Sequence, residues 1–269
     1  MKGRPFLFCM GILLLSYTAY SQVSPPGLGA AKAASWFAFG LKQRFGRSKK
    51  WQSMSYIGMG RKSNPDNDAP FLKPAIWVLN QEFYHQFHPN WQYSMALSYR
   101  KQNEYNDDPP YGQTQAGYKR EWRLYGRMAY SRSSERLKFT TTLRQELRTF
   151  VHPLAEAAGE LLQLRSRLKF QLAVNLDKRK IHRLIAGYES LFSVSRIDQA
   201  DAWTPFRYQE SRFTLYYAVS PLNMPFTIDL GYMNDLVGFK SPYSVHYLAL
   251  DVVFNNPLGL FKKGESRER

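Results

Sequence analysis

Apolar and polar residues alternate with a period of two along several long runs, and this pattern constrains the fold more than any other feature. From Leu137 to Leu147 the odd positions are mostly apolar, whereas the even positions from Lys138 to Arg148 are polar or charged. A helix would mix these two sets on its surface, but a strand separates them onto opposite faces. The run from 162 to 176 alternates in the same way, so the chain is predicted to form amphipathic strands.

The length of these runs separates a membrane barrel from a soluble sandwich, which would also alternate. The runs exceed the five or six residues that are usual in soluble sheets, and they match the 9–11 that a tilted strand needs to cross a bilayer. Several carry aromatic residues near both ends, as with Trp91 and Tyr99, or Tyr118 and Tyr130. Aromatic girdles lie at the two interfaces of membrane barrels. The predicted fold is all-β, a transmembrane up-and-down antiparallel β-barrel of about 10–12 strands.

The connections between the runs alternate between short and long, which gives the expected topology. Short turns are predicted at 88–90, 131–135, 177–180 and 220–225. Longer polar loops are predicted at 61–73, 102–117, 151–160 and 195–205. Membrane barrels place short turns on the periplasmic side and long loops outside.

These connections define ten strands, an even number with both chain ends on the periplasmic side. The upward strands begin near Trp51, Trp91, Leu137, Ile181 and Phe226. The downward strands begin near Ala75, Tyr118, Leu162, Phe206 and Tyr243. A further run from Ser35 to Phe45 also alternates. It either completes a twelve-strand barrel with a poorly marked partner, or lies inside the barrel or across its mouth.

The N-terminus has the three parts of a secretory signal peptide. Lys2 and Arg4 precede an apolar run from Pro5 to Leu15, and small residues then predict cleavage before Gln22. The expected organisation is a signal peptide at 1–21, a linker at 22–34, an outer-membrane barrel at 35–254 and a basic tail at 255–269. The one cysteine, Cys9, falls within the signal, so no disulfide or thiolate site is expected in the mature chain.

Composition narrows the expected partners. The chain has 37 Lys and Arg against 21 Asp and Glu, an excess that often indicates nucleic-acid binding. Here the basic residues are spread at two-residue spacing along strands, which favours a solvated or lumen-facing position. The expected partners are outer-membrane lipids and the machinery that inserts barrels, with no nucleic acid.

Several short motifs lie on these strands, at Trp36 to Lys42, Trp91 to Arg100, Arg165 to Lys169, Tyr188 to Phe192, Arg212 to Leu215, and Gly231 with Tyr232. Together they resemble a family of small outer-membrane barrels known only as a domain of unknown function, common in Gram-negative bacteria of the gliding and gut-dwelling lineage. The resemblance covers nearly the whole predicted mature chain. It implies the location and the fold, without an established activity.

The polar faces of the strands carry many arginines and glutamates, which are expected to face a narrow lumen. The predicted network contains Glu82, Arg100, Glu121, Arg123, Arg127, Arg144, Glu146, Arg148, Arg165, Arg167, Arg183, Glu189, Glu210 and Arg212. Lone charges in such a space are costly, and arginine offers a forked donor to carboxylates. A salt-bridge lattice that closes the barrel is therefore favoured, with a structural role or an accessory role in envelope transport or surface assembly. The alternative is a narrow anion-selective channel or a small-solute binder.

A membrane-embedded hydrolase is the remaining alternative, and the sequence gives it little support. None of the five histidines falls in a recognisable Ser/His/Asp arrangement, and no Gly-x-Ser-x-Gly motif occurs. His85 and Glu82 could approach Asp or Ser across strands, but that would be true of many barrels by chance. We therefore expect no catalytic site, no cofactor and no metal.

Overall fold

The computed structural model describes residues 25–46, 48–151, 153, 160–197, 202–222 and 224–258. The predicted signal peptide, residues 22–24, His152 and the tail from 259 lie outside these described residues. The strands are β1 (Ala33–Phe45), β2 (Trp51–Lys62), β3 (Lys73–His88), β4 (Trp91–Tyr105), β5 (Gln113–Ser133), β6 (Leu137–Val151), β7 (Glu160–Asn175), β8 (His182–Ile197), β9 (Ala202–Trp203), β10 (Arg207–Val219), β11 (Phe226–Val237) and β12 (Tyr243–Asn255). Within the described ranges, no helix is long and apolar enough to span a membrane.

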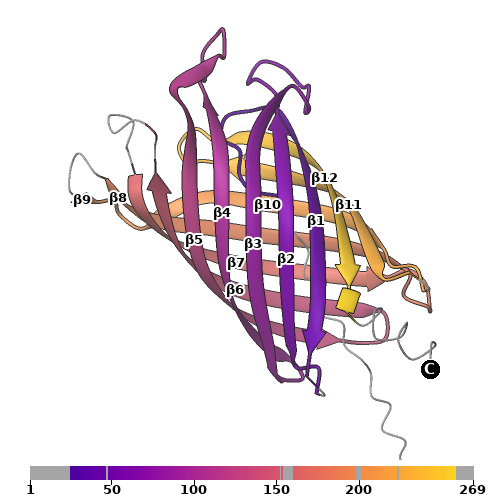
Figure 1. Cartoon of the computed structure of the whole chain (residues 1–269). Coiled ribbons are helices and arrows are strands. Elements are labelled where there is room, and N and C mark those ends of the chain that lie inside the picture. Colours follow the sequence, from indigo (N-terminus) through magenta and orange to yellow (C-terminus); the bar gives the residue numbers. More distant parts are fainter. Residues whose placement is uncertain are drawn as a thin grey trace, which may run out of the picture.

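Eleven of these strands close into a barrel, as predicted in class and size (Figure 1). Neighbours along the chain pair antiparallel, β8 pairs with β10, and the short β9 pairs only with the end of β8. The barrel closes where β1 lies parallel to β12, from Ala33 opposite His246 to Lys42 opposite Asn255. The prediction of an even strand number was therefore wrong. An odd number of alternating strands leaves the first and last running in the same direction, so their pairing must be parallel.

The run from Ser35 to Phe45 is thus a wall strand, not a lumen segment, and it needs no twelfth partner. Five of the ten other predicted strands begin at the residue expected, and four more begin within two residues of it. The exception is β5, which begins at Gln113 because Tyr105 pairs with Gln113 beyond the predicted end of the hairpin. Most of the predicted loop at 102–117 is therefore a strand extension, which rises above the rim in Figure 1.

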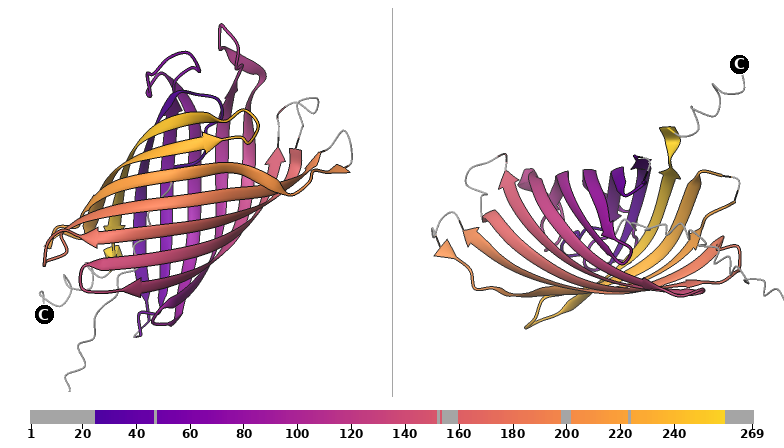
Figure 2. Two further views of the ribbon diagram at one scale, coloured as in Figure 1. Left: turned by 180° about the vertical axis from the view of Figure 1, so that it is seen from behind. Right: turned by 90° about the horizontal axis from the view of Figure 1, so that it is seen from below.

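The barrel has two walls whose strands differ strongly in direction. In the view from behind, the strands from β6 to β12 cross in front of β1 to β4 at a steep angle (Figure 2). Twisted strands must tilt when a sheet closes on itself. In the closed barrel, one face of each strand points outward and the other points into the lumen. Long connections follow β2, β4, β6 and β8 at one end, which we call the loop end, and short turns lie at the other, the turn end.

The outer face of the barrel is largely apolar. Trp91 of β4 packs against Tyr130 of β5 with ring centroids 5.0 Å apart, and the rings of Tyr99 and Trp122 are also 5.0 Å apart. Met95, midway between Trp91 and Tyr99, is 60% exposed. The two aromatic rows are separated by about 26 Å of strand, at roughly 3.3 Å per residue. An exposed apolar belt bounded by aromatic residues is typical of the lipid-facing band of a membrane barrel.

The inner face divides into an apolar half and a charged half. The apolar half belongs mainly to β1, β2, β3, β11 and β12, and it includes Trp36, Met54, Val78, Met233, Val245 and Tyr247. Aromatic rings fit there because the neighbouring strand carries glycine. A Cβ at Gly58 would come within 2.3 Å of the Trp36 ring, and one at Gly231 within 2.1 Å of Tyr216. The charged half belongs to β5, β6, β7, β8 and β10.

A charged septum and two cavities inside the barrel

The centre of the charged half is Glu146, whose side chain is fully buried. Its carboxylate forms ion pairs with three guanidinium groups, through Arg123 Nη1 at 3.1 Å, Arg144 Nε at 2.6 Å and Arg167 Nε at 2.8 Å. These come from β5, β6 and β7, because inward positions on adjacent strands lie side by side. Arg123 also binds Glu121 at 2.7 Å. Three cations around one anion leave charge that further carboxylates must balance.

The network continues in both directions around the wall. At one end of the network, Arg148 Nε lies 2.8 Å from the Glu121 carboxylate. At the other end, Arg167 and Arg212 lie 3.5 and 3.9 Å from Glu189, and Arg212 Nη2 binds Glu210 at 2.5 Å. Arg212 is only 1% exposed, so its charge depends on these partners. We call this connected set the lattice.

The remaining predicted network residues lie inside the barrel but differ in their contacts. Glu82 binds Arg127 at 3.1 Å and accepts from the Ser94 hydroxyl at 2.6 Å. Arg165 lies 3.8 Å from Glu210 and joins the edge of the lattice. Arg100 forms no ion pair with any described residue.

Arg183 lies apart from the lattice near the turn end. Its Nε donates to Asn175 at 3.1 Å. The structure thus joins ten of the fourteen predicted residues into the lattice and pairs Glu82 with Arg127.

Sequence reasoning missed two polar members of this interior. Asp235 is fully buried and lies 3.4 Å from Arg212 Nε. Tyr125 places its hydroxyl 2.9 Å from Glu82, and its ring lies 3.6 Å under the Arg144 guanidinium. Asp235 could have been found, because it shares the inward parity of Gly231 and Met233 along β11.

The segment predicted as a linker at 22–34 is an interior element where the structure describes it. Leu28 is 1% exposed and Ala31 is 5% exposed. Three of its backbone groups are bound by wall side chains: the Pro25 carbonyl by Arg212 Nη1 at 3.0 Å, the Leu28 N–H by the Tyr247 hydroxyl at 3.1 Å, and the Leu28 carbonyl by Lys62 Nζ at 3.1 Å. Lys62 also donates to the Ala30 carbonyl at 3.1 Å. A linker would expose these groups to water, whereas here they are paired.

Two cavities lie on opposite sides of this segment and share no lining residue. The inner vestibule, of about 540 Å³, is lined by Pro25 and Pro26 and reaches the turn-end residues Ser134 and Lys180. The outer cavity, of about 560 Å³, is lined by Leu28, Gly29 and Ala30 and by residues of the β4–β5 hairpin. We call the lattice together with residues 25–31 the septum, because they separate the two cavities.

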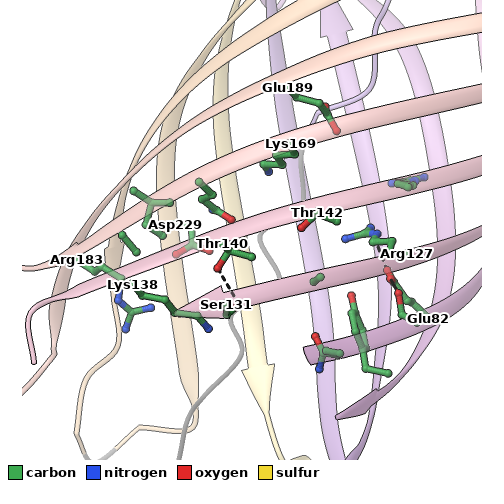
Figure 3. A pocket seen from close by; sticks show the side chains of 18 of the residues that line it. Glu82, Arg127, Ser131, Lys138, Thr140, Thr142, Lys169, Arg183, Glu189 and Asp229 are labelled. Carbon is green, nitrogen blue, oxygen red and sulfur yellow. Dashed lines mark hydrogen bonds and ion pairs between the residues drawn. The ribbon is translucent and has the colours of Figure 1, made fainter. Parts of the chain in front are cut away.

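The walls of the inner vestibule carry nine basic and four acidic side chains. Figure 3 shows Lys138, Arg183 and Asp229 near Thr140 at one end, and Glu82 with Arg127 across the space. Thr140 is held by the Ser131 hydroxyl of the neighbouring strand at 3.0 Å. The charge excess and the hydroxyl and amide groups make the vestibule a polar, cationic recess on rigid strands.

Three described histidines, His85, His182 and His246, lie away from this interior. His85 points outward and stacks on Trp51, with ring centroids 4.2 Å apart, whereas Glu82 points inward. An odd separation along a strand places two residues on opposite faces, so these two side chains do not meet. His182 and His246 pair with the tyrosine hydroxyls of Tyr217 and Tyr232, each at 2.7 Å.

Comparison with known proteins places this architecture in a family. No curated protein matches the chain in sequence. Among solved structures, LpxR from Salmonella typhimurium has a similar fold, with 8% sequence identity and a TM-score of 0.44, over 80% of this chain and 86% of that one. A family model described as "Protein of unknown function (DUF2490)" matches residues 33–244, from the first wall strand into the last. The chain therefore belongs to the DUF2490 family, whose function is unknown.

Proposed function

We propose that this protein is an outer-membrane barrel that does not conduct solutes, with a structural role or an accessory role in envelope transport or surface assembly. The membrane location is supported by the outer face. Soluble proteins rarely expose contiguous apolar patches larger than a few hundred Å². Here Leu79, Met95, Leu97, Leu124 and Leu168 are among the exposed residues of a belt bounded by aromatic rows. Short turns then face the periplasm and long loops face outward.

The septum is the main observation that supports a barrel that does not conduct solutes. Conduction needs a continuous aqueous path, and the two cavities are separated by residues with almost no exposure. Glu146 and Asp235 are fully buried at the side chain, and Leu28 and Tyr247 are each 1% exposed. A narrow anion channel would need these groups to move apart, at the cost of unpairing buried charges.

The test is conductance of the purified protein in planar bilayers, after outer-membrane fractionation and a heat-modifiability assay show that it is a folded membrane barrel. We expect no single-channel steps from the wild type. A variant lacking residues 25–31 serves as the positive control, because removal of that part of the septum should give measurable current. Steady wild-type steps with anion preference would contradict the proposal in favour of a channel. Recovery of the protein only from the soluble fraction would contradict the membrane location.

A further inference from the structure

Two basic side chains lie next to each other on the outer face of the barrel, near the loop end. Lys101 of β4 and Arg120 of β5 are directly opposite each other in the antiparallel pairing of these strands, which lie side by side in Figure 1. Both residues are exposed. Because side chains alternate between the two faces of a strand, Lys101 shares the outward face of Tyr99, and Arg120 shares that of Trp122.

The position of this pair along the strands places it at the edge of the apolar belt. Tyr99 and Trp122 form part of the aromatic row at the loop end. Lys101 and Arg120 lie two residues beyond that row, which is about 7 Å of strand at roughly 3.3 Å per residue. Aromatic rows mark the two interfaces of a membrane barrel. In the orientation proposed above, the two cations therefore lie at the level of the lipid headgroups of the outer leaflet.

No carboxylate of the described ranges balances these two charges. Neither side chain forms an ion pair or a hydrogen bond with any residue that the structure describes. The Lys101 ammonium lies 4.4 Å from the centroid of the Tyr118 ring, an uncharged neighbour on the strand that carries Arg120. A single cation at an interface extends into water and needs no partner. Two like charges directly opposite each other destabilise a sheet, so an anion bound between them would stabilise this arrangement.

We propose that Lys101 and Arg120 bind a lipid of the outer leaflet whose headgroup carries a phosphate monoester, with its acyl chains along the apolar belt. This inference rests on the membrane location and orientation of the proposed function. A phosphate monoester carries about −1.5 to −2 charges near pH 7, so one headgroup balances both cations. A phosphodiester carries a single charge and leaves one cation unbalanced. The guanidinium offers forked donors to phosphate oxygens, and the ammonium adds a further donor.

The surface around the pair suits the rest of such a lipid. Trp77 of β3 is directly opposite Lys101 on the other side of β4 and is 48% exposed. On the membrane side of the aromatic row, Leu97 and Leu124 are directly opposite each other, with 51% and 49% exposure. Tryptophan is common at the boundary between headgroups and acyl chains, and leucine side chains contact the chains themselves. Inorganic phosphate would use only the two cations, whereas a lipid would use the whole surface.

The inference is tested by native mass spectrometry of the delipidated full-length mature protein in a nonionic detergent. Three lipid probes have the same acyl chains and differ only in the headgroup: phosphatidic acid with a phosphate monoester, phosphatidylglycerol with a phosphodiester, and diacylglycerol with no phosphate. Phosphatidic acid should bind at least about tenfold more tightly than the other two, because it alone supplies the second charge. An equal concentration of inorganic phosphate should not displace it.

Three results of this titration would overturn the inference. Equal binding of phosphatidic acid and diacylglycerol would show that the acyl chains alone are bound. Equal binding of phosphatidic acid and phosphatidylglycerol would show that the pair does not select a monoester. Displacement by an equal concentration of inorganic phosphate would show a site for the free anion.

Variants locate the site. Lys101→Gln and Arg120→Gln should each abolish the preference for phosphatidic acid over phosphatidylglycerol, whereas Arg120→Lys keeps the charge and should retain the preference. Arg132→Gln is the matched control. Arg132 also faces outward on β5, two residues beyond Tyr130 at the turn end, but it is opposite Phe139 instead of a second cation. Equal loss of the preference in Arg120→Gln and Arg132→Gln would overturn the inference.

The folding of the variants is checked by the heat-modifiability assay without added lipid. Lys101→Gln and Arg120→Gln remove a repulsion between like charges, so both should remain folded barrels. The outcomes also separate this inference from the proposed function. A non-conducting membrane barrel without the lipid preference overturns the inference and leaves the proposed function standing. A conducting wild type overturns the non-conducting role, whatever the lipid titrations give.

Discussion

Trp36 donates its indole N–H to the Asp251 carboxylate at 3.1 Å, across the parallel pairing of β1 and β12 that closes the barrel. Both residues are almost fully buried, at 1% and 0% exposure. The Trp36 ring lies over Gly58 of β2, so one side chain contacts both neighbours of its own strand. Because parallel pairing is slightly less stable per residue than antiparallel pairing, this contact stabilises the weakest class of junction in the wall.

Loss of the acceptor at this junction should destabilise the barrel measurably. Asp251→Ala leaves the buried indole N–H unpaired, which costs about 1–3 kcal/mol. Asp251→Asn keeps an oxygen acceptor and should cost less. Urea-induced unfolding in lipid vesicles, followed by tryptophan fluorescence, measures both free energies of unfolding. Equal losses in the two variants would show that the hydrogen bond contributes nothing to closure.

Replacement of Glu146 should have a much larger effect than replacement of an ordinary glutamate. Glu146→Gln keeps the shape but leaves Arg123, Arg144 and Arg167 without the anion that they share, at a cost of about 3–5 kcal/mol. Glu104→Gln is the matched control, because Glu104 pairs with Lys119 at 3.1 Å and both side chains are partly exposed. That exposed pair should contribute at most about 1 kcal/mol. The same unfolding assay compares the two variants. Similar losses of unfolding free energy would show that Glu146 stabilises the barrel no more than an exposed glutamate does.

A charge placed in the middle of the exposed belt tests the membrane location. Met95→Arg should destabilise the protein in vesicles by about 2–4 kcal/mol, because the midplane of a bilayer disfavours arginine on the lipid face. Leu176→Arg, at an exposed turn position outside the belt, should change stability by no more than about 0.5 kcal/mol. If both substitutions are harmless and the protein stays folded in water, the outer face is not lipid-facing.

The burial of residues 25–31 depends on the ammonium of Lys62, which binds two carbonyls of that segment. Lys62→Met keeps the apolar stem and removes the donors, so we expect faster amide hydrogen exchange at Leu28 and its neighbours. Lys32→Met is the control, since the Lys32 ammonium pairs with Asp68 at the exposed surface. Exchange measured by mass spectrometry distinguishes the two. Unchanged protection in Lys62→Met would mean that packing of Leu28 alone holds the segment.

The strands and their faces could be predicted from sequence because they depend on local properties. Side chains alternate with a period of two whatever the neighbouring strand is, so the inward position of Arg123, Glu146 and Arg167 follows from parity. Most strand starts also follow from local turn chemistry. β5 was the exception, because Gln113 belongs to the strand only through its pairing with Tyr105.

Closure of the ring was decided only by the tertiary structure. Nothing in the run from Ser35 to Phe45 shows that its second neighbour is β12, because that pairing joins residues more than 200 positions apart. The strand number, the parallel junction and the contact between Trp36 and Asp251 all depend on it. Likewise, Arg212 meets Glu189 and Asp235 only because β8, β10 and β11 lie side by side.

The position of residues 25–31 also could not be predicted from the sequence alone. By composition this stretch of proline, glycine and alanine is typical of a linker, and no periodic pattern marks it. It is buried because the closed barrel offers an apolar half for Leu28 and donors for its carbonyls. Sequence determined which side chains face inward, through the fixed geometry of a strand. Only the tertiary structure decided what meets across the lumen, because those contacts depend on the closure of the whole ring.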